Sequence, residues 1–254
     1  MPEGSKLALA GCHYLGVKYA EMDCQKFIEK CLEEVGLRKD LAGSNAWYRF
    51  VLRNGWIGSP EACRAEFGAV PKGAFLFIHA FDGGEPAKYR RDGIGNASHI
   101  GIYTGMTGAE MAALAIAEGN RNAAKYNFGS GAIHSSSSRG AVATSRFAGR
   151  TIRGGWNRVG LWNAVSYGDP FDRMIRGGKT GGKAMTAKAY AENGKPVNFR
   201  KKPGTSAALA GRIPVGGQVE VLEKGPAWSF CKWKGRTGYV MTRFLIFGEP
   251  LNMI

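Results

Sequence analysis

A glycine-rich, basic stretch, Asp172–Lys183, limits most strongly what this chain can fold into. Its twelve residues hold four glycines and four Lys or Arg, and only two side chains are clearly apolar. This composition is typical of a flexible connection rather than of a packed element. Because 254 residues also exceed the usual size of one compact domain, we expect two domains, residues 1–171 and 186–254, joined by a flexible basic linker at 172–185.

The clearest local pattern upstream of the linker is an amphipathic helix that begins at Asp23. Apolar residues recur there at helical spacing, Asp23 is a favoured N-cap residue, and Gly36 supplies a stop. The apolar positions are Cys24, Phe27, Ile28, Cys31, Leu32 and Val35. Cys24 is therefore expected in the first turn of a helix.

Other segments complete an α+β pattern upstream and an all-β pattern downstream. We expect a second helix at Asn45–Arg53 and strands at Ala74–Ala80, His99–Thr104, Ala115–Glu118 and Ala132–Ser135. Residues 186–247 alternate short β-like runs with Gly and Pro turns. The fold class that follows is an α+β domain followed by a small all-β domain.

The charge balance narrows the class of partner. Lys and Arg outnumber Asp and Glu by 35 to 20, a formal net charge of +15, which indicates a polyanionic partner such as nucleic acid or the bacterial wall. No helix-turn-helix or RNA-binding motif is present, which disfavours nucleic acid. No apolar run approaches the roughly 18 residues that span a bilayer, so we expect no membrane insertion.

The five cysteines indicate free thiols. They form no C-x-x-C pair and no even set, which argues against a zinc cluster, and no metal or cofactor is expected. Leu9–Cys12 resembles a lipoprotein processing box, but too few residues precede it for a signal peptide. We therefore expect synthesis in the cytoplasm without a recognisable signal.

Cys24 and His99 are candidates for a nucleophile and its base. A thiol in the first helical turn meets free N–H groups and the positive end of the helix dipole, although the Asp23 carboxylate opposes thiolate formation. A cysteine nucleophile needs an imidazole within reach, and His99 stands where a polar loop enters a strand. His134 is the favoured third residue that orients the imidazole, with Glu118 as the alternative.

Three ordered motifs carry a resemblance to a known family: Tyr19–Phe27, with Asp-Cys at its centre, Val70–Phe77, and Ser98–Gly105, which begins Ser-His-Ile-Gly-Ile-Tyr. Together they resemble the NlpC/p60 family of cell-wall cysteine peptidases. The resemblance covers roughly residues 1–165 and implies a papain-like catalytic domain. Two departures are an alanine, Ala74, where the family has Asp, and an apparent insertion at Met106–Gly131.

That resemblance implies cleavage of peptidoglycan stem peptides between D-γ-glutamate and the diamino acid, through a thioester acyl-enzyme. Cys24, His99 and His134 match the catalytic positions. Tyr19, Asp23 and Ser98 match substrate-binding positions, with Asp23 suited to a free L-Ala amine and equally to a simple N-cap role.

The downstream segment resembles the bacterial SH3-like domain, a small barrel. The match runs from Val197 to Leu245 and includes Trp228, Trp233 and Gly238-Tyr239-Val240. Residues 186–254 hold 11 Lys or Arg against 4 Asp or Glu, which suits an anionic wall. Trp228, Trp233 or Tyr239 are either barrel core or the lining of a groove for a stem or bridge peptide.

The sequence therefore predicts a modular peptidoglycan hydrolase of the phage or prophage lysin type, a cysteine endopeptidase that acts at the wall. One alternative is a CHAP-like N-acetylmuramoyl-L-alanine amidase, which uses the same order of Cys and His. Another is a catalytically inactive wall-binding protein.

Overall fold

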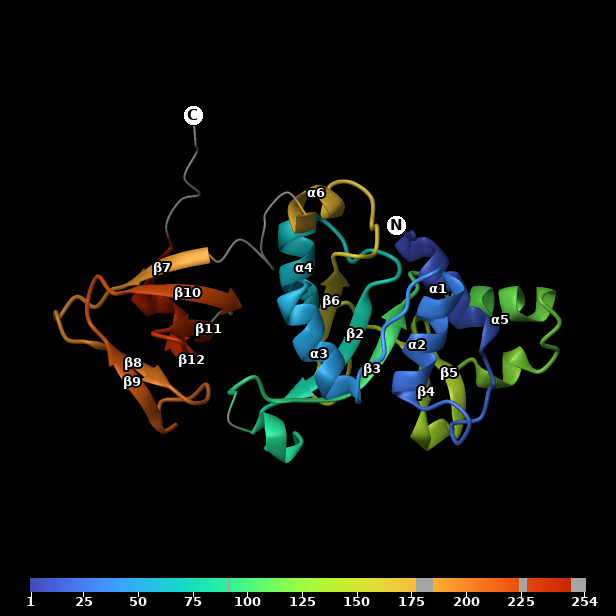
Figure 1. Ribbon diagram of the computed structural model, residues 1–254, viewed down its shortest axis with the longest axis horizontal. Helices are drawn as coiled ribbons and strands as arrows, with labels where there is room; N and C mark the ends of the chain where they lie inside the picture. Colours follow the sequence, from blue (N-terminus) through green and yellow to red (C-terminus); the bar gives the residue numbers. More distant parts are fainter. Residues whose placement is uncertain (91, 177–184, 224–227, 248–254) are drawn as a thin grey trace. The chain divides into compact units, whose positions relative to one another are not determined.

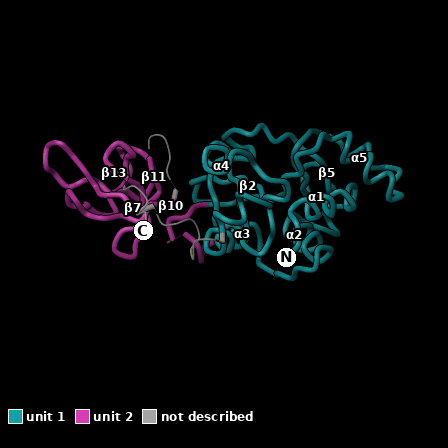
Figure 2. The backbone as a smooth tube through the Cα atoms, turned by 90° about the horizontal axis from the view of Figure 1, so that it is seen from above, with its two compact units in different colours: residues 1–85, 96–181 teal, residues 86–95, 182–254 magenta. Residues whose placement is uncertain are grey.

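The computed structural model describes residues 1–90, 92–176, 185–223 and 228–247, and the chain divides into two compact units (Figure 2). The first unit comprises residues 1–85 and 96–181, and the second comprises 86–95 and 182–254. The first is mixed α+β and the second is rich in β-strand, so the coarse fold class expected from the sequence is confirmed.

A six-stranded antiparallel sheet forms the centre of the first unit (Figure 1). The strands lie in the order β1-β6-β2-β3-β4-β5. Their bounds are Gly55–Gly58 (β1), Phe75–Ala80 (β2), Asn96–Tyr103 (β3), Gly131–Ser136 (β4), Ala141–Arg146 (β5) and Arg158–Trp162 (β6). The order places β3 and β4, which carry His99 and His134, next to each other.

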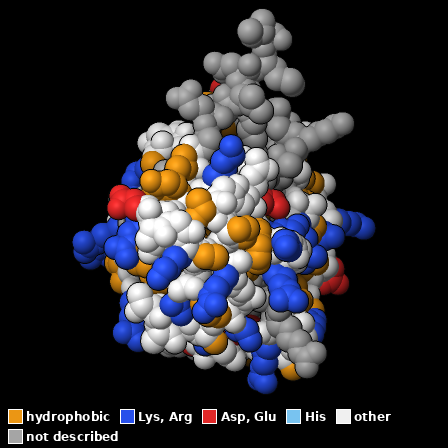
Figure 3. All heavy atoms as spheres, turned by 90° about the vertical axis from the view of Figure 1, so that its left-hand side faces the viewer, with side chains coloured by type: hydrophobic (Ala, Val, Ile, Leu, Met, Phe, Trp, Pro, Cys, Tyr) orange, Lys and Arg blue, Asp and Glu red, His pale blue; other side chains and the backbone are white. Residues whose placement is uncertain are grey.

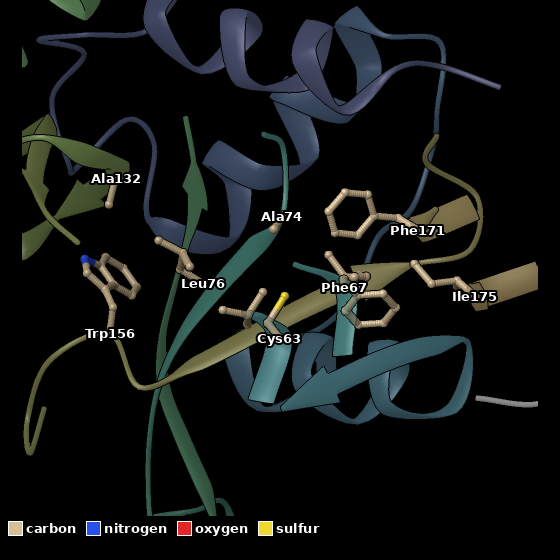
Figure 4. Close-up of a cluster of buried hydrophobic side chains, with 10 residues drawn as sticks. Cys63, Phe67, Ala74, Leu76, Ala132, Trp156, Phe171 and Ile175 are labelled. Carbon is tan, nitrogen blue, oxygen red and sulfur yellow. The ribbon is translucent and has the colours of Figure 1, made fainter. Parts of the chain in front are cut away.

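Helices cover both faces of this sheet. Phe77 of β2 packs edge-on against Tyr48 of α3, and its neighbour Leu76 packs on the opposite face with Phe67 of α4 and Phe171 of α6 (Figure 4). Strand alternation explains why adjacent residues serve different layers. The helices are Gly4–His13 (α1), Cys24–Glu34 (α2), Ser44–Arg53 (α3), Pro60–Phe67 (α4), Gly108–Ala117 (α5) and Phe171–Arg176 (α6).

Helix α2 confirms the strongest prediction from the sequence. Its N-cap is Asp23, whose Oδ1 accepts the backbone N–H of Lys26 at 2.8 Å. The middle of the apolar stripe, Phe27, Ile28, Cys31 and Leu32, is buried, whereas Cys24 and Val35 at its ends are partly exposed. The helix contacts β3 and β4. The helix therefore holds Cys24, its first residue, against the two strands that carry the histidines.

One predicted strand is wrong. Ala115–Ala117 forms the end of helix α5 and Glu118 is its C-cap; the helix starts with a capping box between Thr107 and Glu110. Alanine favours helix strongly, and a short apolar run alone does not distinguish a strand from a buried helix.

The beginning of the expected linker also differs from the prediction. Residues 172–176 form the end of α6, whose Phe171 and Ile175 join the buried cluster drawn in Figure 4. The i, i+4 spacing of these two side chains gives the short helix an apolar face. The rest of the expected linker, residues 177–184, lies outside the described residues.

Seven antiparallel strands form the sheet of the second unit, in the order β13-β7-β10-β11-β12-β8-β9. Its core gathers Val197, Phe199, Ile213, Cys231 and Val240, among other buried side chains. The strands are Met185–Ala189 (β7), Val197–Arg200 (β8), Leu209–Ile213 (β9), Gln218–Glu223 (β10), Trp228–Trp233 (β11), Arg236–Met241 (β12) and Leu245–Phe247 (β13).

Within the described residues, no helix combines the length and the apolar character needed to cross a membrane.

Candidate active site

Cys24 is the accessible thiol of the chain. The other four of the five cysteines are buried, whereas Cys24 is partly exposed at the start of α2. A structural cysteine in an apolar core is inert, and a reactive one has to meet solvent or substrate. Cys24 meets that condition.

The segment that leads into Cys24 bonds to both β3 and β4. In the described chain these strands pair only at Ile102–Ile133 and Tyr103–Ala132. Towards the other end of β4, Ser135 Oγ donates a hydrogen bond to the carbonyl oxygen of Met22. On the β3 side, the backbone N–H of Ile100 bonds to the Cys24 sulfur. The sulfur is thus held beside the residue that follows His99.

The environment of Cys24 favours the neutral thiol. Burial raises its pKa most, and the Asp23 carboxylate raises it further. The backbone N–H groups of Ile100, Gln25 and Cys24 itself act in the opposite direction but do not outweigh these effects. The helix N-terminus therefore does not by itself produce a thiolate, and the sulfur needs a base to remove its proton.

His99 and His134 form a hydrogen-bonded pair. His99 Nε2 lies 2.6 Å from His134 Nδ1, and the two rings meet nearly edge to face. Burial lowers the pKa of His99 to about 4, and burial together with the charge of His99 lowers that of His134 to about 3. Both rings are thus neutral near pH 7. When His99 donates its Nε2–H to His134, its Nδ1 carries a free lone pair that can accept a proton.

Trp156 packs against both histidines, and no sequence motif marks it as part of the site. Its ring stacks on His99 at 5.4 Å between centroids and meets His134 edge-on at 5.1 Å. Its Nε1–H donates to Ser145 Oγ at 3.0 Å, and the residue is 6% exposed. In Figure 4 the indole lies beside Ala132 and Leu76 at one end of the buried cluster. Trp156 keeps water away from both imidazoles and so contributes to their lowered pKa values.

Gly101 leaves the space that this arrangement needs. A Cβ at position 101 would lie 2.9 Å from the Trp156 ring and 3.0 Å from the Cβ of His134. Both distances are shorter than ordinary carbon contacts. The glycine two residues after His99 therefore allows indole and imidazoles to pack together.

The three predicted substrate-binding residues surround the start of α2 and the start of the His99 strand. Tyr19 is half-buried, and its pKa is raised first by burial and then by the negative charge of Cys24 and Asp23, which places its phenol close to both. Asp23 is exposed and serves as the N-cap of α2. Ser98 is exposed and donates to the Ile78 carbonyl at 3.4 Å. Tyr19 and Asp23 thus lie with Cys24.

The remaining candidates take other roles. Glu118, the alternative third residue, is exposed at the C-cap of α5, whereas His134 contacts His99 directly. His79 is buried in β2 and stacks on Tyr48 at 4.7 Å. Among the described residues, no group of three or more His, Cys, Asp or Glu side chains is placed to hold a metal ion.

Comparison with known protein families gives a match in the second unit. Residues 195–246 match the bacterial SH3 domain. The match covers strands β8 to β12 and confirms the SH3-like part of the prediction. Bacterial SH3 domains are common in proteins that bind or hydrolyse the cell wall. No curated protein matches the chain significantly. The resemblance of the first unit to NlpC/p60 peptidases stays a prediction.

Proposed function

We propose that the chain is a peptidoglycan hydrolase, a cysteine endopeptidase that cleaves the bond between D-γ-glutamate and the diamino acid of stem peptides. The observations that support the proposal are the partly exposed Cys24 thiol, whose sulfur bonds to the backbone N–H of Ile100 next to His99 in the chain, and the hydrogen bond between His99 and His134. This combination supplies a nucleophile, a base and a group that orients the base.

The first step is removal of the thiol proton. Burial keeps both the Cys24 thiol and the His99 imidazole neutral at rest, so His99 is ready to take up a proton. His99 Nδ1 accepts the thiol proton while the sulfur attacks the γ-carbonyl carbon. His134 fixes the ring of His99 through the 2.6 Å contact and leaves Nδ1 free. General base catalysis of this type contributes roughly 10²–10⁴-fold in rate.

The next steps release the two products. The first N–H groups of α2 stabilise negative charge near the sulfur, and the backbone N–H of Cys24 is suited to hold the developing oxyanion. The His99 imidazolium then protonates the leaving amine of the diamino acid, and a thioester remains on Cys24. Water, deprotonated by His99, hydrolyses this thioester and frees the γ-carboxylate and the thiol.

Two further features support a wall substrate. The second unit contains a bacterial SH3 domain, and such domains often bind cell wall. The exposed Asp23 carboxylate, adjacent to Cys24, suits the free amine of an L-Ala residue at the end of a stem. Tethering through the SH3 domain would raise the effective concentration of substrate at the catalytic unit.

The test is mass spectrometry of purified peptidoglycan digested by wild-type protein, by Cys24→Ala and by Cys63→Ala. Cys63 is buried and serves as the matched control for loss of a cysteine. Both diaminopimelate and lysine types of wall are used. We expect new L-Ala-D-Glu ends with wild type and Cys63→Ala, and none with Cys24→Ala.

Two outcomes would overturn this assignment. Free muramoyl ends that depend on Cys24 would identify an amidase. No product from wild-type protein on either wall type would leave a wall-binding protein without this activity.

A further inference from the structure

The segment Met106–Gly131, an apparent insertion in the first unit, contains helix α5, and the proposed reaction does not use it. Figures 1 and 2 show α5 at the periphery of the first unit. Glu110 is the only charged residue among the ten of α5. Two large apolar side chains of this helix are exposed, Leu114 at 37% and Ile116 at 44%. A helix with an apolar outer face indicates an interaction surface.

Helical spacing explains how this outer face is built. The buried side of α5 consists of Gly108, Met111, Ala112 and Ala115. The opposite side holds Glu110, Ala113 and Ala117, which are all exposed. Leu114 and Ile116 lie along the two borders of that side. The small side chains in its middle let a second helix come close while the two larger side chains pack against it.

The charges at the two ends of α5 favour a second copy of the chain as the partner. Glu110 lies in the first turn, and the two bonds that its carboxylate accepts from Thr107 both end at Oε2, which leaves Oε1 available. Arg121 and Lys125 follow the last turn, are exposed, and form no ion pair with a carboxylate in the described chain.

An antiparallel pair of such helices is complementary in charge. The acidic end of one helix meets the basic end of the other, and the two helix dipoles oppose each other. An anionic lipid surface would instead repel Glu110 and Glu118, which is exposed at the C-cap of α5. The face therefore suits another copy of itself better than it suits a negatively charged surface.

We propose that two copies of the chain associate through α5, with the two helices antiparallel about a two-fold axis. Leu114 and Ile116 of each copy are then buried against the small side chains of the other copy, and Glu110 meets the partner's Arg121. In a two-fold contact one patch serves both copies, so it has to be complementary to itself.

The association is weak because the contact is small. One face of a ten-residue helix is smaller than the roughly 800 Å² per partner that a stable interface buries. We therefore expect a dissociation constant on the order of 10–100 µM. The dimer would carry two bacterial SH3 domains, and two linked binding modules hold a surface more tightly than one. The inference goes beyond the proposed function and does not require it.

The experiment is sedimentation equilibrium of the full chain over roughly 5–500 µM, a range that brackets this constant. The chain carries a formal net charge of +15, and the face drawn in Figure 3 shows many Lys and Arg side chains and few acidic ones. Two copies therefore repel each other at low salt. About 0.3 M salt shortens the screening length below about 10 Å and removes most of this repulsion.

The first variant, Leu114→Gln with Ile116→Gln, removes the two exposed apolar side chains and keeps a residue type that favours helix. Its matched control is Leu209→Gln with Ile152→Gln, a Leu and an Ile outside α5 that are 40% and 41% exposed. We expect the first variant to weaken association at least about tenfold. The control is expected to leave association unchanged.

A second pair of variants tests the antiparallel arrangement. Arg121→Glu places two carboxylates opposite each other and is expected to weaken association roughly threefold or more. Adding Glu110→Lys to this variant restores an opposite pair and is expected to recover most of the loss. Thermal unfolding of each variant checks that the first unit stays folded.

Three results would each overturn the proposal: no self-association up to about 500 µM, equal effects of the apolar variant and its control, or no recovery on charge reversal. Sedimentation of a monomeric chain with phosphatidylglycerol vesicles, lost in Leu114→Gln with Ile116→Gln, would also overturn it and would assign the face to a lipid surface. The measurement involves no catalysis, so its result is independent of the Cys24 chemistry.

Discussion

Lowering the pH from 7.5 to 5.0 is expected to destabilise the first unit through its two buried imidazoles. In the unfolded chain both histidines ionise near their ordinary pKa of 6.5, whereas in the folded unit the pKa is about 4 for His99 and about 3 for His134. Between pH 6.5 and the folded-state pKa values, the unfolded state binds more protons than the folded state. The free energy of unfolding is therefore highest above pH 6.5 and decreases as the pH falls below it. The loss amounts to about 2 kcal/mol per ring over this interval.

His134→Asn isolates this effect. The Asn Oδ1 can still accept the Nε2–H of His99, but one of the two buried bases is gone. Wild type is expected to lose about 4 kcal/mol from these rings between pH 7.5 and 5.0, and the variant about 2 kcal/mol. With a urea dependence of about 2 kcal/mol per molar, the midpoint of wild type moves about 1 M further than that of the variant.

The assay is urea unfolding read by pulsed hydrogen exchange and mass spectrometry, followed on peptides from β3 and β4. Reading these peptides separately keeps unfolding of the second unit out of the signal. The comparison at pH 7.5 removes any loss of packing caused by the substitution itself. Equal midpoint shifts in wild type and His134→Asn would refute the argument that the pair is held neutral by burial.

Three further outcomes are expected. Because His99 has to be neutral to accept the thiol proton, the acid limb of kcat/KM for wall-peptide hydrolysis is expected below pH 5, and a limb at pH 6.5 or above would contradict its burial. Gly101→Ala is expected to cost about 1–3 kcal/mol by overpacking Trp156 and to lower kcat; thermal unfolding and hydrolysis measure both. Gly155→Ala, whose Cβ would make only ordinary contacts from 3.4 Å outward, is its control and is expected to be near neutral. Iodoacetamide is expected to label Cys24 before the four buried cysteines, as peptide mapping would show; uniform labelling of all five would contradict the difference in exposure.

The parts of the site that sequence alone predicts depend on local signals. The start of α2 at Cys24 follows from the Asp23 cap and a stripe of apolar side chains at helical spacing, and both lie within a dozen residues. Strands β2 and β3 likewise follow from short apolar runs bounded by turns. The strand predicted at Ala115–Glu118 is wrong because the deciding signal, the cap at Thr107, lies eight residues upstream.

The parts that sequence does not predict depend on contacts between distant residues. Ser135 bonds to Met22 across 113 positions, and Trp156 packs on His99 without any motif around it. No local pattern distinguishes a tryptophan that covers an imidazole from one that fills a core, because both are buried apolar side chains. The same holds for Trp228, which lines a cavity of the second unit, whereas Trp233 at the other end of β11 packs against the core.

In the described chain only two residue pairs join β3 to β4, so the relative position of His99 and His134 depends on the register of these strands. Alternation means that a slip of β4 by one residue would turn His134 to the opposite face of the sheet and bring Ile133 or Ser135 to its side. The two paired positions, together with the long ladder between β4 and β5, prevent that slip. The connection, with α5 inside it, also bonds to the strand ends: the backbone N–H of Gly131 donates to the Met106 carbonyl, and that of Gly108 donates to Ser130 Oγ. Insertions or deletions in the connection are therefore expected to leave the two imidazoles opposed as long as these bonds and the register of β4 are kept.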